Sequence, residues 1–146
     1  MKKKSQLEFF YQDLDELRKI VIENQTLFQS GTVFLLSGAM GAGKTEFVKT
    51  VVEVLHRNKN ASSPTFSLHH HYEGHPNIEH WDLYRLKNED DLESSGFWDQ
   101  FSDQGSLIFI EWPEKIKIDL LPVDWKIISF EFKVLDTEKR QLRCFW

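Results

Sequence analysis

The sequence is poor in cysteine, proline and glycine, with one, four and seven of them in 146 residues. Because Cys144 is the only cysteine, the chain cannot form an internal disulfide bond. No apolar run is long enough for a signal peptide or a membrane-spanning helix. We therefore expect a cytoplasmic protein that does not contact a membrane.

Positive charge is also scarce. The chain has 18 basic and 23 acidic residues, a net charge of -5, and its one basic cluster is Lys2-Lys3-Lys4. Proteins that bind nucleic acid directly usually present a basic surface, because contacts to phosphates dominate their affinity. The composition therefore argues against direct binding of nucleic acid by this chain.

Three of the seven glycines, Gly38, Gly41 and Gly43, lie close together in a motif at residues 38–45. The run Gly38-Ala39-Met40-Gly41-Ala42-Gly43-Lys44-Thr45 fills every fixed position of G-x-x-x-x-G-K-[ST], between a strand-like and a helical segment. Such a loop binds phosphate oxygens through its backbone N–H groups at the start of a helix. We predict that Lys44 reaches the β- and γ-phosphates and that Thr45 binds Mg²⁺. The remaining predicted nucleotide-binding residues of the loop are Gly38, Gly41, Ala42 and Gly43.

Length and apolar spacing predict one domain that spans residues 1–146. The expected strands cover residues 6–11, 32–37, 65–72, 78–83, 107–110, 125–135 and 141–146. One helix is expected after Asp13, with apolar positions as far as Leu27, and two more at residues 44–56 and from Asn88 through Ser94. The predicted fold is α/β, a P-loop NTPase-like three-layer arrangement with a mostly parallel central sheet and antiparallel hairpins at its edges.

Two acidic residues follow apolar strands. Asp82 ends the segment that begins at Ile78, and Glu111 follows the apolar run Leu107 to Ile110. Ligands of open α/β sheets gather at the carboxyl ends of strands, where a carboxylate can hold Mg²⁺ or polarise the attacking water. We predict that Asp82 and Glu111 are catalytic and divide these two tasks. The alternative for Asp82 is a turn or helix cap before Leu83.

Three further residues have two open interpretations each. Thr65 either senses the γ-phosphate or belongs to an ordinary Ser-Pro-Thr loop. Arg85 either stabilises charge on the phosphates or forms a surface salt bridge. Trp112 either joins the core or covers the nucleotide as an exposed lid.

Two sequence features bear on the cofactors. The segment Asn58-Lys59-Asn60-Ala61 lacks the aspartate of the Asn-Lys-x-Asp motif that recognises guanine, which favours ATP. The histidines of the stretch His69-His70-His71, together with His75 and His80, do not predict a metal site, because no cysteine or close carboxylate pattern completes a tetrahedral set. The expected cofactors are ATP and Mg²⁺.

The order of the motifs resembles the TsaE (YjeE) family. After the glycine loop come Ser63-Pro64-Thr65-Phe66, then the block from His80 to Leu86, then Glu111-Trp112-Pro113-Glu114, and the similarity runs from about Asp13 to Leu121. Members are small bacterial ATPases required for threonylcarbamoyladenosine (t6A) formation in tRNA. The resemblance implies that this chain binds the TsaD and TsaB proteins, and tRNA only through them, and that ATP hydrolysis resets that complex.

The resemblance also implies a role for individual residues. Thr45 and Glu111 become the Mg²⁺ side of the site, Lys44 the phosphate ligand, Thr65 the switch threonine and Asp82 a residue needed for hydrolysis. Trp112 belongs to the same family block.

The sequence departs from the family inside and after the glycine loop. Ala39-Met40 replaces the usual Asp-Leu, and Glu46 stands where a second threonine is common, so its negative charge is expected to weaken nucleotide binding.

Two rival functions remain open at this stage. One is a P-loop kinase of a nucleoside or small molecule, which is disfavoured because arginine is scarce and there is no spare lid. The other is a regulatory module that binds nucleotide without useful hydrolysis.

Overall fold

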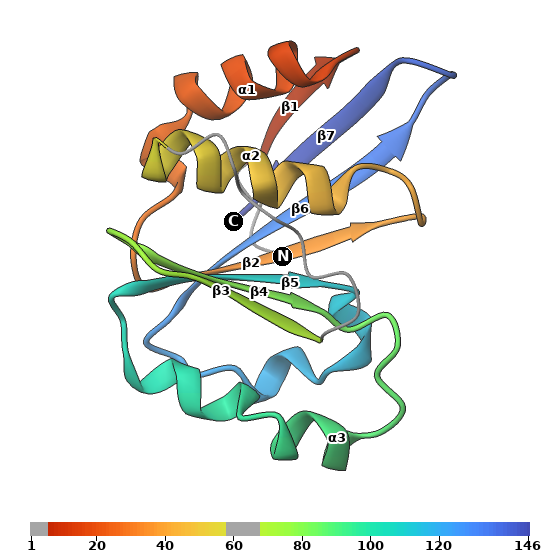
Figure 1. Cartoon of the computed structure of the whole chain (residues 1–146). Coiled ribbons are helices and arrows are strands. Elements are labelled where there is room, and N and C mark those ends of the chain that lie inside the picture. Colours follow the sequence, from red (N-terminus) through yellow and green to blue (C-terminus); the bar gives the residue numbers. More distant parts are fainter. Residues whose placement is uncertain (1–5, 58–67) are drawn as a thin grey trace.

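The strands form one sheet in the computed structural model, which describes residues 6–57 and 68–146. The sheet has seven strands in the order β1-β7-β6-β2-β5-β4-β3 (Figure 1). The strands are β1 (Gln6–Tyr11), β2 (Thr32–Gly38), β3 (His69–Tyr72), β4 (Asn77–Asp82), β5 (Ser106–Glu111), β6 (Lys126–Val134) and β7 (Arg140–Phe145). The helices are α1 (Leu14–Glu23), α2 (Lys44–His56) and α3 (Glu89–Ser94), with short 3-10 helices η1 (Gln25–Leu27), η2 (Phe97–Ser102), η3 (Pro113–Lys115) and η4 (Ile118–Leu120).

The centre of the sheet is parallel and its edges are antiparallel. The strand β2 pairs in parallel with β5 and β6, and β5 pairs in parallel with β4. Antiparallel pairing adds β3 at one edge, and β7 and β1 at the other. The α/β fold with a central parallel sheet and antiparallel edge hairpins is therefore confirmed.

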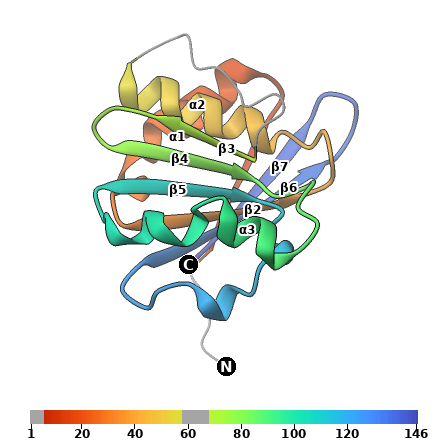
Figure 2. The ribbon, with the colours of Figure 1, turned by 60° about the horizontal axis from the view of Figure 1, so that its bottom comes forward.

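Helices cover both faces of the sheet and bury two apolar cores. Figure 1 shows α1 and α2 on one side, with α3 on the other. Figure 2 shows from a second direction that β3, β4, β5 and β2 lie side by side with α3 in front of them. Phe47 of α2 packs with Phe34 and Phe109 in the first core, whereas Leu92 of α3 packs with Trp81 and Ile110 in the second. Alternation along each strand explains this division, because neighbouring residues face opposite sides.

The caps of two helices follow the sequence, and their lengths differ in part. The backbone N–H of Glu16 donates to Asp13 Oδ1 at 2.8 Å, and that of Asp91 donates to Asn88 Oδ1 at 2.9 Å. However, α1 ends at Glu23, and Leu27 lies in the separate helix η1. The strands begin and end within one residue of their expected bounds, except that residues 65–67 lie outside the described part of the chain.

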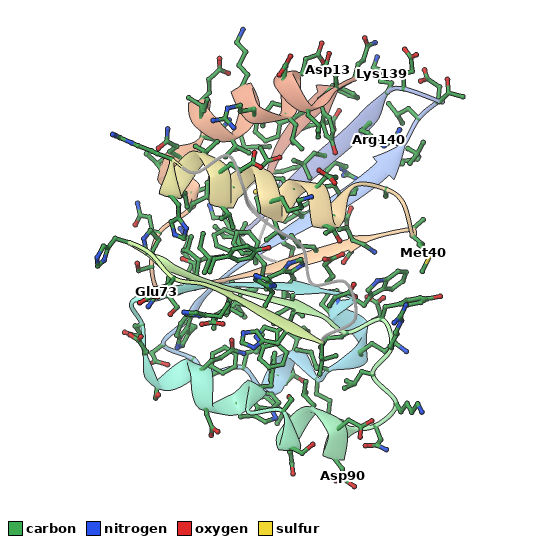
Figure 3. The ribbon with its side chains drawn as sticks, in the orientation of Figure 1. Asp13, Met40, Glu73, Asp90, Lys139 and Arg140 are labelled. Atoms are coloured by element: carbon green, nitrogen blue, oxygen red, sulfur yellow. The ribbon has the colours of Figure 1, made fainter. Side chains whose placement is uncertain are left out.

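The parallel strands bring their carboxyl ends to the same edge of the sheet. Figure 3 shows Met40, just past the end of β2, at one end of the molecule, and Glu73, in the turn between β3 and β4, at the other. The fold thus presents the glycine loop, Asp82 and Glu111 together at the carboxyl ends of the parallel strands.

Within the described residues no helix is long and apolar enough to cross a membrane.

Cys144 provides a test of the edge pairing. Its side chain is fully buried in β7, opposite Leu7 on β1 and Phe130 on β6, and burial raises the pKa of its thiol from 9.0 to about 12, against a small opposite effect of Lys126. Because only the thiolate reacts, we expect iodoacetamide to label the native protein on the order of a thousandfold more slowly than N-acetylcysteine at mildly alkaline pH. Mass spectrometry measures the rate, and labelling in concentrated urea is the positive control. Rapid labelling of the native protein would contradict the burial of β7 between β1 and β6.

Candidate functional site

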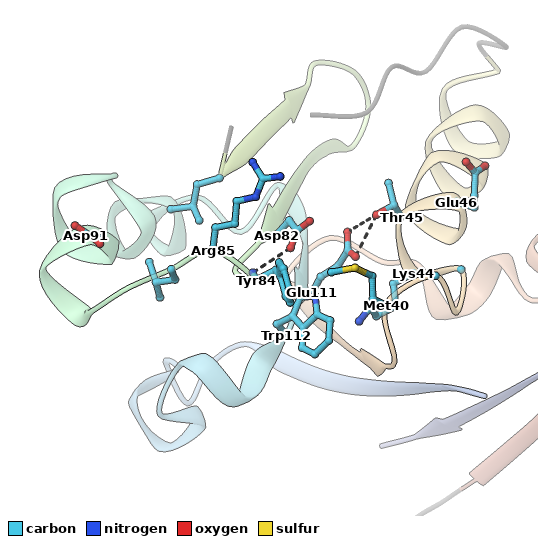
Figure 4. A pocket seen from close by; sticks show the side chains of 14 residues that line it. Met40, Lys44, Thr45, Glu46, Asp82, Tyr84, Arg85, Asp91, Glu111 and Trp112 are labelled. Atoms are coloured by element: carbon cyan, nitrogen blue, oxygen red, sulfur yellow. Dashed lines mark hydrogen bonds between the residues drawn. The ribbon is translucent and has the colours of Figure 1, made fainter. Parts of the chain in front are cut away.

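A cleft of about 570 Å³ opens at the carboxyl ends of β2, β5 and β4. It collects most of the residues that the sequence marks as functional: Gly41, Gly43, Lys44, Thr45, Asp82, Arg85, Glu111 and Trp112. Figure 4 shows Lys44 and Thr45 at the start of α2, Glu111 at the end of β5 and Asp82 at the end of β4 around the same space. Gly38 lies beside this cleft at the end of β2, and the side chain of Ala42 is buried in the core under α2.

Two glycines of the loop occupy positions that other residues do not fit. Gly43 caps α2 with a left-handed φ of 109°, and a Cβ there would lie 3.1 Å from the Tyr11 hydroxyl. Gly38 has a φ of 153°, and its Cβ would lie 2.7 Å from the carbonyl oxygen of Phe132 on β6. A side chain at Gly38 would therefore collide with the backbone of β6, and one at Gly43 would strain the left-handed backbone and press on the Tyr11 side chain.

Lys44 is folded over its own loop. Its Nζ donates a hydrogen bond to the Gly38 carbonyl oxygen at 2.5 Å and lies 3.6 Å from the centre of the Trp112 ring. Burial lowers the pKa of Lys44 below its ordinary value, although the nearby carboxylates, Glu111 above all, act in the opposite direction. The lysine is thus a cation held in partly dry surroundings, where an added anion would interact with it strongly.

Thr45 and Glu111 meet across the cleft. The Thr45 hydroxyl lies 2.9 Å from Glu111 Oε2 and 3.1 Å from Oε1, and Glu111 is only 3% exposed (Figure 4). The two residues come from the first turn of α2 and the last position of β5. A hydroxyl and a carboxylate so placed are the oxygen ligands that Mg²⁺ prefers.

These ligands fit a Mg²⁺ ion that also binds phosphate. In the described residues there is no group of three or more His, Cys, Asp or Glu side chains that could hold a metal ion by itself. Mg²⁺ needs no such group, because it usually takes one or two protein oxygens and completes its shell with water and substrate phosphates. The Thr45 hydroxyl and the Glu111 carboxylate supply this number.

Asp82 lies in the cleft and also shapes the turn that follows it. Its Oδ1 accepts a hydrogen bond from the backbone N–H of Tyr84 at 3.1 Å, and the residue pairs with Glu111 in the β4–β5 register. The turn interpretation of Asp82 therefore describes one of its oxygens, while the side chain still faces the cleft (Figure 4). Both interpretations of this residue are compatible with the geometry.

Trp112 stands at the mouth of the cleft in an unusual conformation. Its backbone has a φ of 61°, which is uncommon for a bulky residue. Its half-buried ring packs against Tyr84 at 5.1 Å between centroids as well as over Lys44. Trp112 is therefore packed against the edge of the second core and also borders the cleft.

The two remaining predicted residues, Arg85 and Thr65, fall respectively beside the cleft and outside the described part of the chain. Arg85 is exposed beside the cleft and forms no ion pair with any described residue. Thr65 and the rest of Ser63 to Phe66 lie outside the described residues. Of the residues that depart from the family pattern, Met40 and Glu46 line the cleft, and Glu46 lies 3.7 Å from Lys49.

One side chain next to the site was not predicted. His80 is completely buried, and its Nε2 lies 2.5 Å from Glu111 Oε2. The sequence places His80 in the motif block that ends at Leu86 and among the histidines rejected as metal ligands, but neither pattern predicts its contact with Glu111. Strand alternation offered a signal, because His80 stands two residues before Asp82 and so shares its face of β4.

His69 and His71 have an acidic partner on the neighbouring strand. Glu79 on β4 contacts both of them, at 2.5 Å from His71 Nδ1. The contact depends on the register that sets His71 opposite Glu79. The histidine stretch is therefore tied to an acidic side chain of the neighbouring strand.

Comparisons with known proteins agree on one family. The family model described as "Threonylcarbamoyl adenosine biosynthesis protein TsaE" matches residues 11–142. The chain is 40% identical over 110 residues to a protein of Rickettsia prowazekii named tRNA threonylcarbamoyladenosine biosynthesis protein TsaE, which covers 74% of this chain and 73% of that one. A protein of the same name from Aquifex aeolicus is 33% identical over 142 residues, with coverage of 94% and 95%.

A solved structure supports the fold. The crystal structure of Bacillus subtilis YdiB superposes with a TM-score of 0.76 at 24% identity, and the match covers 99% of this chain and 88% of that one. The similarity extends over the whole sheet. It agrees with the P-loop NTPase-like arrangement described above.

The Glu79 contacts predict a pH dependence of stability. Burial by itself would raise the pKa of Glu79, but the hydrogen bonds and the positive charge of His69 and His71 together outweigh it and hold the pKa below the ordinary 4.5. Since the folded-state pKa is the lower one, the stabilisation is present above 4.5 and is lost as the pH falls through the folded-state value. We expect Glu79→Gln to lower the free energy of unfolding by about 1 kcal/mol at neutral pH and by less in acid, measured by urea denaturation.

Glu73→Gln is the matched control, because Glu73 is an exposed glutamate in the turn between the same two strands. It should leave the unfolding free energy unchanged throughout. A Glu79→Gln effect that stays constant down to acid pH would contradict the assigned contacts.

Proposed function

The chain belongs to the TsaE family, and we propose on this premise that it is a Mg²⁺-dependent ATPase that serves the formation of t6A in tRNA. The observation that carries the proposal is the meeting of Thr45 and Glu111, 2.9 Å apart, beside the buried Lys44. This places a hydroxyl, a carboxylate and a cation around the start of α2. These are the three groups with which a P-loop site binds a nucleoside triphosphate and its Mg²⁺ ion.

The glycine loop would hold the phosphates. Its backbone N–H groups lie at the positive end of α2, and Gly38, Gly41, Ala42 and Gly43 leave the backbone free to approach the oxygens. Lys44 would exchange its hydrogen bond with the Gly38 carbonyl for the β- and γ-phosphates. That exchange satisfies the ammonium with negative charge, which a carbonyl dipole and an aromatic ring do not supply.

Thr45 and Glu111 would hold Mg²⁺. When bound, the ion neutralises charge that develops on the phosphates. Glu111 can ligate it directly or through water, because its carboxylate already faces the Thr45 hydroxyl. The buried position of this carboxylate limits competing hydration.

Asp82 would orient the attacking water. Its Oδ1 is fixed by the Tyr84 N–H, which leaves the second oxygen available to accept a proton from water in the cleft. Arg85, exposed at the same edge, would stabilise charge on the leaving phosphate. Thr65 remains the proposed sensor of the γ-phosphate.

We further propose that the activity belongs to a complex with TsaD and TsaB in the cytoplasm. ATP binding and hydrolysis would reset that complex between rounds, and slow hydrolysis is expected from the chain alone. The acidic net charge of -5 fits this division, because the partners rather than this chain would hold the tRNA.

Phosphate release with and without the partners tests this function. We expect TsaD and TsaB together to raise the turnover of the purified chain several-fold, and both to be retained by the tagged chain in a manner that differs between ATP, ADP and no nucleotide. A panel of nucleosides and sugars serves as acceptor control. Unchanged turnover together with phosphorylation of an acceptor would favour the small-molecule kinase, and binding without any hydrolysis would favour the regulatory module.

Two substitutions separate nucleotide binding from hydrolysis. Lys44→Ala removes the phosphate ligand, so we expect ATP affinity to fall by about 10- to 100-fold. Asp82→Ala should keep the affinity and lower the hydrolysis rate by about 100-fold or more. Equilibrium binding of a fluorescent ATP analogue and single-turnover hydrolysis measure the two effects.

Asp91→Ala is the control for Asp82, because Asp91 is an acidic residue that lines the same cleft from α3. It should change neither quantity. An equal loss of affinity in the Lys44 and Asp82 variants would remove Asp82 from its assigned role.

A further inference from the structure

His80 is a completely buried polar side chain that the proposed chemistry does not use. It lies in the middle of β4, with no exposed surface, between His70 on β3 and Phe109 on β5 in the register of the sheet. A histidine in such a position is most often explained by a hydrogen bond that satisfies it. The partner of that hydrogen bond is therefore the question.

The partner of His80 is the carboxylate of the site. Its Nε2 lies 2.5 Å from Glu111 Oε2, and its Nδ1 is buried without a hydrogen-bond partner among the described residues. An ionised carboxylate only accepts hydrogen bonds, so Nε2 carries the hydrogen and donates it. The one hydrogen bond seen for this imidazole thus goes to Glu111.

Glu111 is held from two sides. The Thr45 hydroxyl contacts both of its oxygens from α2, and His80 contacts Oε2 from β4 (Figure 4 shows the Thr45 side). The backbone adds to this, because Asp82 is the direct strand partner of Glu111 and His80 precedes it by two residues on the same face. The buried imidazole therefore contacts Glu111 from outside the cleft, whereas Asp82 lines the cleft.

We propose that His80 is a positioning residue that fixes the Glu111 carboxylate toward Thr45 and thereby sets the affinity of the site for the Mg²⁺–nucleotide complex. The inference rests on the proposed function, since it concerns the same ion. A carboxylate that binds a metal is usually oriented by such a donor, and loss of the donor typically costs about 10- to 100-fold in metal affinity.

The alternative is a histidine that only fills the core. In that case its replacement would lower stability and leave the response to Mg²⁺ unchanged. The two roles therefore differ in how strongly Mg²⁺ raises the affinity for nucleotide, which can be measured separately from stability.

Three substitutions of His80 vary the donor. His80→Phe removes it, His80→Asn shortens it out of reach of Glu111, and His80→Gln keeps an N–H at nearly the distance of Nε2. The probe is a fluorescent, non-hydrolysable ATP analogue, titrated in EDTA and at rising Mg²⁺. In EDTA we expect all the proteins to bind the analogue with similar affinity. The Phe and Asn variants should need about 10- to 100-fold more Mg²⁺ than the unchanged protein to reach half of the increase in affinity that Mg²⁺ causes. The Gln variant should respond nearly as the unchanged protein does.

His70→Phe is the matched control, because His70 lies opposite His80 on β3 and packs its ring against Tyr72 instead of Glu111. It should keep the normal Mg²⁺ response. Thermal unfolding reports whether each variant folds, and the Asn and Gln variants decide the matter if the Phe variant does not.

The outcomes separate this inference from the function it rests on. A normal Mg²⁺ response in the Phe and Asn variants, or in the Asn variant if only that one folds, would overturn the role of His80 and leave the ATPase proposal intact. Nucleotide binding that does not respond to Mg²⁺ even in the unchanged protein would overturn both.

Discussion

The burial of the Glu111 carboxylate is the constraint on which the site depends. A carboxylate with 3% of its surface exposed is costly unless donors surround it. Its donors, Thr45 and His80, come from α2 and β4, two elements that both precede β5 in the chain. Satisfying this one group therefore fixes the start of the helix, the end of the central strand and the neighbouring strand relative to one another.

The sequence predicted those parts of the fold and the site that depend on local patterns. The glycine loop, the caps at Asp13 and Asn88 and the strands ending at Asp82 and Glu111 each follow from spacing within a few residues. The contacts of His80 with Glu111 and of Glu79 with His71 could not be predicted in this way, because they depend on which strand lies beside which and in what register. The role of Thr65 stays a prediction.

The conformation of Trp112 and the short helix η2 were missed for different reasons. A left-handed backbone at a tryptophan is disfavoured locally and is maintained here by the surrounding contacts, including the hydrogen bond of its N–H to the Leu36 carbonyl at 3.3 Å. The helix η2 has six residues, too few for a helical period to stand out, and its Phe97 and Phe101 are fixed by the second core. In both places tertiary packing outweighs the preference of the local sequence.

The position of β6 has a consequence for the order in which the protein folds. Residues 126–134 supply one of the two direct neighbours of β2, and Phe132 provides the wall against which Gly38 rests. A ribosome makes the phosphate loop long before it makes that wall, and pairing across so many residues carries a large loop-closure cost. The nucleotide site should therefore become competent late in synthesis, as a product of the whole chain and not of the motif that identifies it.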